Sequence, residues 1–267
     1  MASEEDEDAA VKWILQKFNE DFRVKLKTAF SPPYAEPGPK AIPNEIERYE
    51  ASVRKAKSQL RTGIRPMFEE LCNKRIVPRI LYAQQAYVCG HTLFQKDLYT
   101  EAQFCLDEFL NLEEKTPSSD VVQALFTKAQ CLFYAVMKSD QTMARPATLD
   151  ICISALDLIQ KGMEMVVAAK EDTWNMLHYN GSLLIYEFCN EMIKYGFASN
   201  VVNYLSWSLL CLESVIAFTA DVNYLEWRIR IYIAVAKCYE YTRQYPQALT
   251  VLVRAEQKIQ EVHQNNL

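Results

Sequence analysis

Histidines and cysteines are the side chains in this 267-residue sequence that could bind a metal or act as a base and a nucleophile. The three histidines, His91, His178 and His263, lie far apart, and none has a second ligand four residues later. A metal site needs three or four converging ligands, so this spacing predicts no metal. His178 and Cys189 could pair as base and nucleophile, but eleven residues of helix separate them by about 16 Å. The sequence therefore predicts no enzyme, no metal and no cofactor.

Composition excludes several other classes of function. Only six glycines occur, which argues against Gly-rich phosphate loops, tight hairpins and an all-β fold. The net charge of −5 provides no general attraction to nucleic acid or to anionic lipid. The eight cysteines form no Cys-x-x-Cys pair and fall mostly in apolar runs, which predicts small buried side chains in a reducing compartment. We expect a soluble, intracellular protein without a nucleic-acid, membrane or small-molecule partner.

The longest apolar run, residues 201–218, is too polar to cross a membrane as a single helix. It contains Asn203, three serines and Glu213, and these residues suit a helix that is buried inside a protein.

Helical periodicity extends over nearly the whole chain and defines its predicted organisation. Residues 1–30 are an acidic leader and an amphipathic helix, and 31–43 form a connector because five of the ten prolines fall between 32 and 43. Residues 44–267 read as one helical-repeat domain of about nine or ten helices. Its first helix is predicted to start at an Asn44 N-cap and to end or bend near Gly63 and Pro66. Later helices are predicted at roughly 98–114, 119–138, 147–170, 173–195, 197–218, 221–244 and 246–263.

The last two predicted helices match the pattern of a tetratricopeptide repeat, in which small and large residues alternate at fixed offsets. Ala236 and Ala248 occupy its small positions and would let two antiparallel helices approach closely. Pro246 falls in the first turn of the second helix, where its missing N–H costs nothing. The remaining pattern positions are filled by large, aromatic or small residues: Tyr232, Val235, Tyr239, Tyr245, Leu252 and Ala255.

A second match lies earlier in the chain and supports a repeating fold. Gly90, Tyr99, Ala102 and Leu106 fit the same pattern, whereas Phe109 stands where a small residue is expected. We therefore predict an all-α fold, a tetratricopeptide-like right-handed array of antiparallel helix pairs, or α-solenoid. The final "HQNNL" predicts a polar finish to the last helix.

One basic stripe is a candidate partner-binding surface. Arg54, Lys57 and Arg61 recur at helical spacing on one face, and no acidic residue interrupts the sequence from 51 to 68. This pattern fits a docking stripe for an acidic partner such as a tubulin tail, and the alternative is a solvated basic face.

The groove that stacked first helices would line is the second candidate surface. Arg230, Lys237 and Tyr241 should project into it from the last repeat, and the alternative is plain solvated surface. Ile233 stands where a clamp for terminal carboxylates would need a polar group, so binding of peptide carboxylates is not expected.

Residues 179–241 resemble the N-terminal helical region of the cilia- and flagella-associated protein 54 family. The resemblance extends back to about residue 44, and its marks are spread over predicted helices: Asn180, Gly181, Tyr186, Gly196, Trp207, Glu213, Trp227 and Tyr239. The family implies a very large axonemal protein in a projection of the central-pair apparatus, needed for assembly and beating of motile cilia and sperm flagella. A sister axonemal repeat protein of the same apparatus is the alternative.

The resemblance implies a non-enzymatic scaffold of the ciliary or flagellar axoneme, located in the cytoplasm and cytoskeleton. Other central-apparatus proteins, and tubulin, are the expected partners. Because the chain is far shorter than full-length family members, we expect a fragment or short form of a larger protein. The alternative function is a soluble tetratricopeptide-type cytoplasmic adaptor that binds partner peptides.

Overall fold

The structure, a computed structural model, is all-helical in the residues that it describes. Nine α-helices and one short 3-10 helix occur in these ranges and no strand does, so the predicted all-α class is confirmed for them. The chain divides into two compact units, Met1–Leu112, called here the N-terminal unit, and Glu113–Leu267, the C-terminal unit. The described residues are 20, 24, 36–39, 41–71, 79–113, 117–215 and 224–265.

The N-terminal unit contains three described helices, α2 (Pro43–Leu71), α3 (Arg79–Gln95) and α4 (Tyr99–Glu113). The predicted end near Gly63 and Pro66 is wrong, because α2 continues through both residues. Asn44 is not the N-cap either, since α2 begins one residue before it. The predicted leader and its amphipathic helix, residues 1–30, lie outside the described residues except for two helical positions, and the domain boundaries stay predictions.

Helices α3 and α4 pack at the small residue that the repeat pattern singled out. A Cβ atom added at Gly90 would lie 2.7 Å from Leu106 Cγ, so only glycine allows this approach without a shift of the leucine. Phe109, the mismatch to the pattern, is buried and its ring lies 5.2 Å from the ring of Tyr87. The larger side chain is thus accommodated between the two helices.

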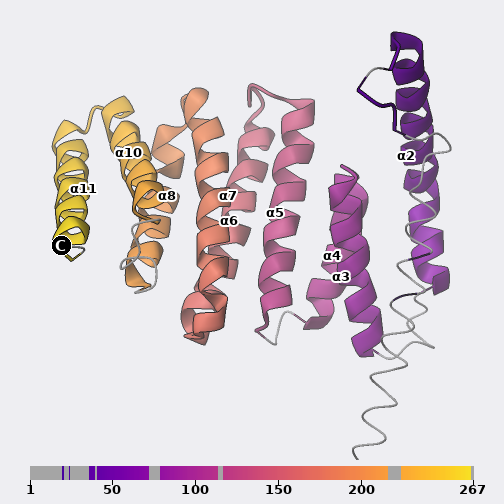
Figure 1. The fold of residues 1–267 in the computed structure, drawn as a ribbon, viewed down its shortest axis with the longest axis horizontal. Coiled ribbons are helices and arrows are strands. Elements are labelled where there is room, and N and C mark those ends of the chain that lie inside the picture. Colours follow the sequence, from indigo (N-terminus) through magenta and orange to yellow (C-terminus); the bar gives the residue numbers. More distant parts are fainter. Residues whose placement is uncertain are drawn as a thin grey trace, which may run out of the picture. The chain divides into compact units, whose positions relative to one another are not determined.

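In its described residues, the C-terminal unit contains six long helices that lie side by side (Figure 1). Their observed bounds agree with the predicted ranges to within about four residues, because the apolar periodicity is strong along each helix. The elements are α5 (Ser119–Ser139), α6 (Pro146–Ala169), η1 (Asp172–Trp174), α7 (Asn175–Lys194), α8 (Ala198–Ser214), α10 (Leu225–Tyr241) and α11 (Tyr245–Asn265).

Local signals explain where several of these helices start and stop. The Ser118 hydroxyl caps α5 by accepting from the Val121 N–H, and Pro146 opens α6 at a position where no N–H donor is needed. Gly196 adopts a φ of 92° in the turn between α7 and α8, a conformation that glycine takes at little cost.

The helices of the C-terminal unit pack in a regular order. Consecutive helices form pairs, α5 with α6, α7 with α8 and α10 with α11. The second helix of one pair also packs on the first helix of the next, α6 on α7 and α8 on α10. First helices touch one another as well, α5 with α7 and α7 with α10. This arrangement is compatible with a helical repeat.

Small and aromatic residues make the contacts that join one helix pair to the next. A Cβ atom added at Gly181 of α7 would lie 2.6 Å from Met163 Cγ of α6, so these helices are in closer contact than any larger residue permits. Phe133 of α5 and Phe188 of α7 stack with ring centroids 3.9 Å apart. Trp227 of α10 donates a hydrogen bond of 2.9 Å to the hydroxyl of Ser182 on α7. One continuous hydrophobic core therefore runs through this unit.

The cysteines behave as the sequence predicts in the part of the chain that the structure describes. Seven of the eight lie there, and all seven are buried free thiols. Among the described helices none combines the length and the apolar character needed to span a bilayer.

Candidate functional site

The basic stripe predicted on residues 54–61 lies on helix α2. Arg54 is exposed and therefore accessible to a partner. The side chains of Lys57 and Arg61 lie outside the described residues, although both positions are helical in the backbone. The structure places the three residues on one helix, and their role as a docking stripe stays a prediction.

The second predicted surface lies on one face of α10, and every residue named for it is exposed. Arg230, Lys237 and Tyr241 are accessible, and Ile233 lies between them on the same face. Arg230 forms an exposed ion pair of 2.6 Å with Glu226, one turn earlier on α10. The surface thus combines a paired cation, a second cation and two apolar side chains, a mixture typical of the rim of a protein interface.

His178 and Cys189 both lie on α7, and the structure shows no hydrogen bond between them. The thiol of Cys189 points to the Val201 carbonyl oxygen on α8, 3.9 Å away. Burial raises the pKa of Cys189 well above its ordinary value, helped by the nearby thiol of Cys238, so the reactive thiolate is disfavoured at neutral pH. Burial also lowers the pKa of His178, which keeps the imidazole neutral. Both side chains are buried, and they contribute to packing.

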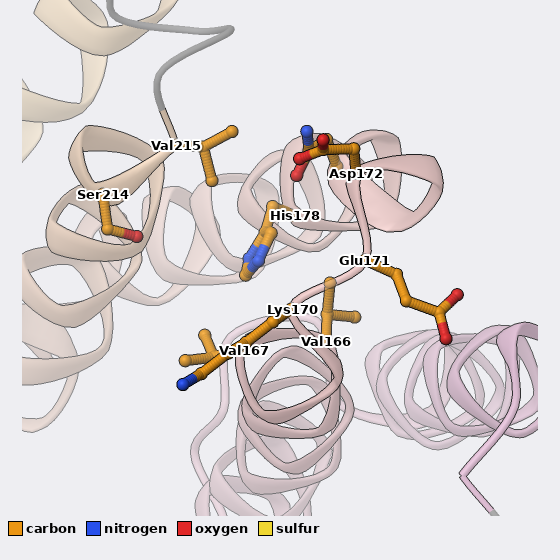
Figure 2. Close-up of a pocket in the computed structure, with 9 residues that line it drawn as sticks. Val166, Val167, Lys170, Glu171, Asp172, His178, Ser214 and Val215 are labelled. Atoms are coloured by element: carbon orange, nitrogen blue, oxygen red, sulfur yellow. The ribbon is translucent and has the colours of Figure 1, made fainter.

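His178 instead lines a pocket at the ends of helices α6, α7 and α8 (Figure 2). The pocket has a volume of about 730 Å³, and sequence reasoning missed it because its walls come from two stretches that are far apart in the sequence, 166–178 and 214–215. Its lining residues are Val166, Val167, Lys170, Glu171, Asp172, Asn175, His178, Ser214 and Val215.

The polar groups of this pocket do not form a catalytic arrangement. His178 is 4% exposed, and its Nδ1 atom has no hydrogen-bond partner among the residues that the structure describes. Lys170, Glu171 and Asp172 are exposed on the rim, with the Glu171 carboxylate directed away from the imidazole in Figure 2. Within the described ranges no three histidine, cysteine or carboxylate side chains gather as a metal site would require.

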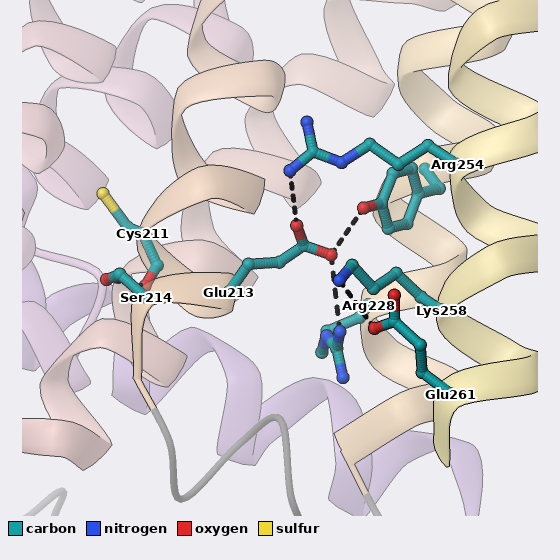
Figure 3. A network of polar contacts seen from close by, with 8 residues as sticks. Cys211, Glu213, Ser214, Arg228, Arg254, Lys258 and Glu261 are labelled. Carbon is teal, nitrogen blue, oxygen red and sulfur yellow. Dashed lines mark hydrogen bonds and ion pairs between the residues drawn. The ribbon is translucent and has the colours of Figure 1, made fainter. Parts of the chain in front are cut away.

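A largely buried charge cluster joins α8, α10 and α11 (Figure 3). Glu213 of α8 accepts hydrogen bonds from Arg228 Nη2 at 3.3 Å and from Arg254 Nη2 at 2.9 Å. The hydroxyl of Tyr232 donates to the same carboxylate. The side chains of Glu213 and Arg228 are only 9% and 2% exposed, so this is a buried ion pair rather than a surface one.

The cluster has a visible signal in the sequence. Glu213 is the single charged residue in the apolar run 201–218, and such a residue is buried only when it is paired. Its partners Arg228 and Arg254 are 15 and 41 residues away, on helices whose rotation the sequence does not specify. Burial and hydrogen bonding to Glu213 also raise the pKa of Tyr232, which keeps its hydroxyl a donor.

Comparison with known proteins shows which family the chain belongs to. A family model described as "Cilia- and flagella-associated protein 54" matches residues 102–267, which include all of the C-terminal unit. The chain belongs to this family. The resemblance stated for residues 179–241 is therefore confirmed, and so is the predicted location in the cilium or flagellum, whereas the extension back to about residue 44 stays a prediction.

Three curated relatives carry the same description and are far longer than this chain. The human protein is 28% identical over 115 residues, which cover 43% of this chain and 4% of the relative. The mouse protein is 27% identical over 144 residues, covering 54% and 4%. The Chlamydomonas reinhardtii protein is 31% identical over 169 residues, covering 58% and 5%.

Several marks of the family resemblance are residues that hold helices together. Gly181 allows the close contact of α7 with α6, and Glu213 is the acceptor of the buried cluster. The Tyr186 ring meets the Trp227 ring edge-on, with centroids 5.0 Å apart, across α7 and α10. These residues serve architecture, as expected from their types.

Proposed function

We propose that this chain is a non-enzymatic structural segment of the axoneme, in the central-pair apparatus, needed for assembly and movement of cilia and sperm flagella. The observation that supports this most strongly is the membership of the family together with the interlocked core of the C-terminal unit. Stacked rings, close glycine contacts and an enclosed ion cluster join successive helix pairs. Such a stack resists deformation, which suits a part that holds other proteins in fixed positions.

The arrangement we propose is a right-handed, tetratricopeptide-like array. Its first helices are α5, α7 and α10, and its second helices are α6, α8 and α11. The observed packing order supports this assignment, because each second helix other than α11 contacts the first helix of its own pair and that of the next. An array of this kind presents its first helices along one shared surface.

Two surfaces are proposed to bind partners, which are other central-apparatus proteins and tubulin. The exposed face of α10 with Arg230, Lys237 and Tyr241 lies on a first helix and so belongs to the shared surface. The basic stripe Arg54, Lys57 and Arg61 would attract acidic tubulin tails. Reversing the three charges of the stripe should reduce co-sedimentation with microtubules at low salt, and unchanged co-sedimentation would identify it as solvation only.

The proposed function is tested by detergent extraction of ciliated cells that express the tagged chain. A structural segment should remain with the insoluble axoneme and co-purify with central-pair fractions. A soluble adaptor, the alternative supported by the exposed α10 face, would leave with the detergent-soluble fraction. Recovery of the tagged chain in that soluble fraction would overturn the structural proposal.

A further inference from the structure

Helix α11 carries a row of large apolar side chains on the surface of the protein. The residues of this row, called here the outer α11 seam, are between 43% and 64% exposed. They recur at helical spacing over four turns and therefore share one side of the helix. The seam consists of Tyr245, Leu249, Leu252, Val253 and Ile259.

The seam is separate from the side of α11 that packs on α10. That packed side carries Ala248, Ala255 and Val262, all buried. At about 100° of rotation per residue, the two sides are roughly 100° apart around the helix. Helix α11 thus has two apolar sides, whereas the outer surface of a terminal helix should be polar.

The earlier helix pairs of this chain indicate what covers such a second side. Helix α6 packs on both α5 and α7, and α8 packs on both α7 and α10. Among the described helices, α11 occupies the equivalent place after α10 but has no following helix. Its Arg254 points back to Glu213 on α8, and the outer α11 seam lies roughly 180° from Arg254 around the helix. The outer α11 seam therefore lies on the side of α11 that is turned away from the preceding helix pairs.

We infer that the outer α11 seam is the docking surface for the first helix of a further helical hairpin from this family. The curated relatives have room for it, since this chain spans only 4% to 5% of their length. The occupant is an amphipathic helix with a small residue at its centre, by analogy with Gly181 of α7, which contacts Met163 of α6. This inference rests on the proposed array and does not depend on the ciliary role.

A second copy of this chain is a poorer occupant. A symmetric contact between two α11 helices would bury about five side chains from each copy. Stable interfaces between separate proteins bury roughly 20–30 residues on each side. A hairpin joined in the same polypeptide needs much less contact area, because the linkage raises its effective concentration.

The inference is tested by fusing a further segment directly after Leu267 of the full chain. The segment has about 70 residues, or two 34-residue hairpins, and follows the matched region in the human, mouse or Chlamydomonas relative. The readout is the rate at which maleimide labels an introduced cysteine, Leu252→Cys. The seven described native cysteines are buried, so they contribute little background.

Fusion of at least one segment should slow labelling of the Leu252→Cys variant at least 10-fold. Labelling of Gln257→Cys, a matched control on the exposed polar side of α11, should change less than 2-fold. Adding Leu249→Lys to the fused chain should restore fast labelling at position 252. These three results together support a helix seated on the seam.

Two results would overturn the inference. One is equal labelling of Leu252→Cys with and without each of the three fused segments. The other is protection of the unfused chain that increases with protein concentration, which would assign the seam to a second copy. Neither result bears on whether the chain stays with the axoneme, so this failure is distinct from failure of the proposed function.

Discussion

Removing the carboxylate of Glu213 should destabilise the C-terminal unit far more than removing a surface carboxylate. Glu213→Ala leaves the Arg228 guanidinium, whose side chain is 2% exposed, without its carboxylate partner. Its Nε and Nη1 atoms already have no hydrogen-bond partner among the described residues, so the whole charged group would then be unsatisfied. Arg254 is half exposed and can turn to water instead.

The magnitude follows from this difference in burial. Removing one partner of a buried ion pair costs about 3–5 kcal/mol, because the remaining charge stays out of water. The exposed pair Arg230–Glu226 on α10 provides the matched control, and such pairs contribute about 0.3–0.5 kcal/mol. We therefore expect Glu213→Ala to cost several times more than Glu226→Ala.

The assay is urea unfolding followed by tryptophan fluorescence at neutral pH. Three of the four tryptophans, Trp174, Trp207 and Trp227, lie in the C-terminal unit, so the signal reports mainly on that unit. The midpoint should fall strongly for Glu213→Ala and little for Glu226→Ala. The double variant Glu213→Met with Arg228→Met should recover much of the loss, since apolar residues can replace a buried pair at little cost.

An equal fall of the midpoint in Glu213→Ala and Glu226→Ala would contradict the larger cost expected for the buried pair. A double variant as unstable as Glu213→Ala would show that the unpaired Arg228 guanidinium is not the cause of the loss.

Three further predictions concern packing and pH. Gly181→Ala places a Cβ about 2.6 Å from Met163 Cγ and should cost about 1–3 kcal/mol by overpacking, measured as a lower urea midpoint. Ala236→Leu on α10 should cost a similar amount, about 1–3 kcal/mol, and an unchanged melting temperature would contradict the repeat alignment. The backbone N–H of Arg145 and neighbouring donors hold the pKa of Asp140 below its ordinary value. The stabilisation that ionised Asp140 provides is therefore present at pH values above its ordinary pKa, and it is lost as pH falls through the lowered pKa of the folded protein. Asp140→Asn should lower the urea midpoint at about pH 7, and the difference from the parent should shrink as pH falls through the lowered pKa of Asp140. A difference that is independent of pH would contradict this prediction.

Most helices could be predicted from the sequence because their signals are local. Apolar periodicity, Pro146 in the first turn of α6 and Gly196 after α7 are all visible in a short window. The prediction failed at α2, where Gly63 and Pro66 suggested an end that the structure does not have. Residue propensity is a weak guide when the flanking sequence favours helix on both sides.

The functional surfaces could be predicted only in part. The exposed face with Arg230, Lys237 and Tyr241 follows from the spacing of residues on one helix, and all three side chains are accessible. The His178 pocket and the partners of Glu213 could not be predicted from the spacing of residues on one helix. Both depend on how separate helices are rotated and aligned against one another, which no single helix encodes.

The amino-acid sequence by itself determined the helices, the family and the small residues that allow close packing. Tertiary structure alone decided which side of each helix is covered. Leu252 belongs to the same repeat pattern as Ala248 and Ala255, yet the two alanines are buried whereas Leu252 and its neighbour Leu249 are exposed. The physical reason is that helical periodicity fixes angles around one axis, whereas burial depends on which neighbouring helices are present to exclude solvent.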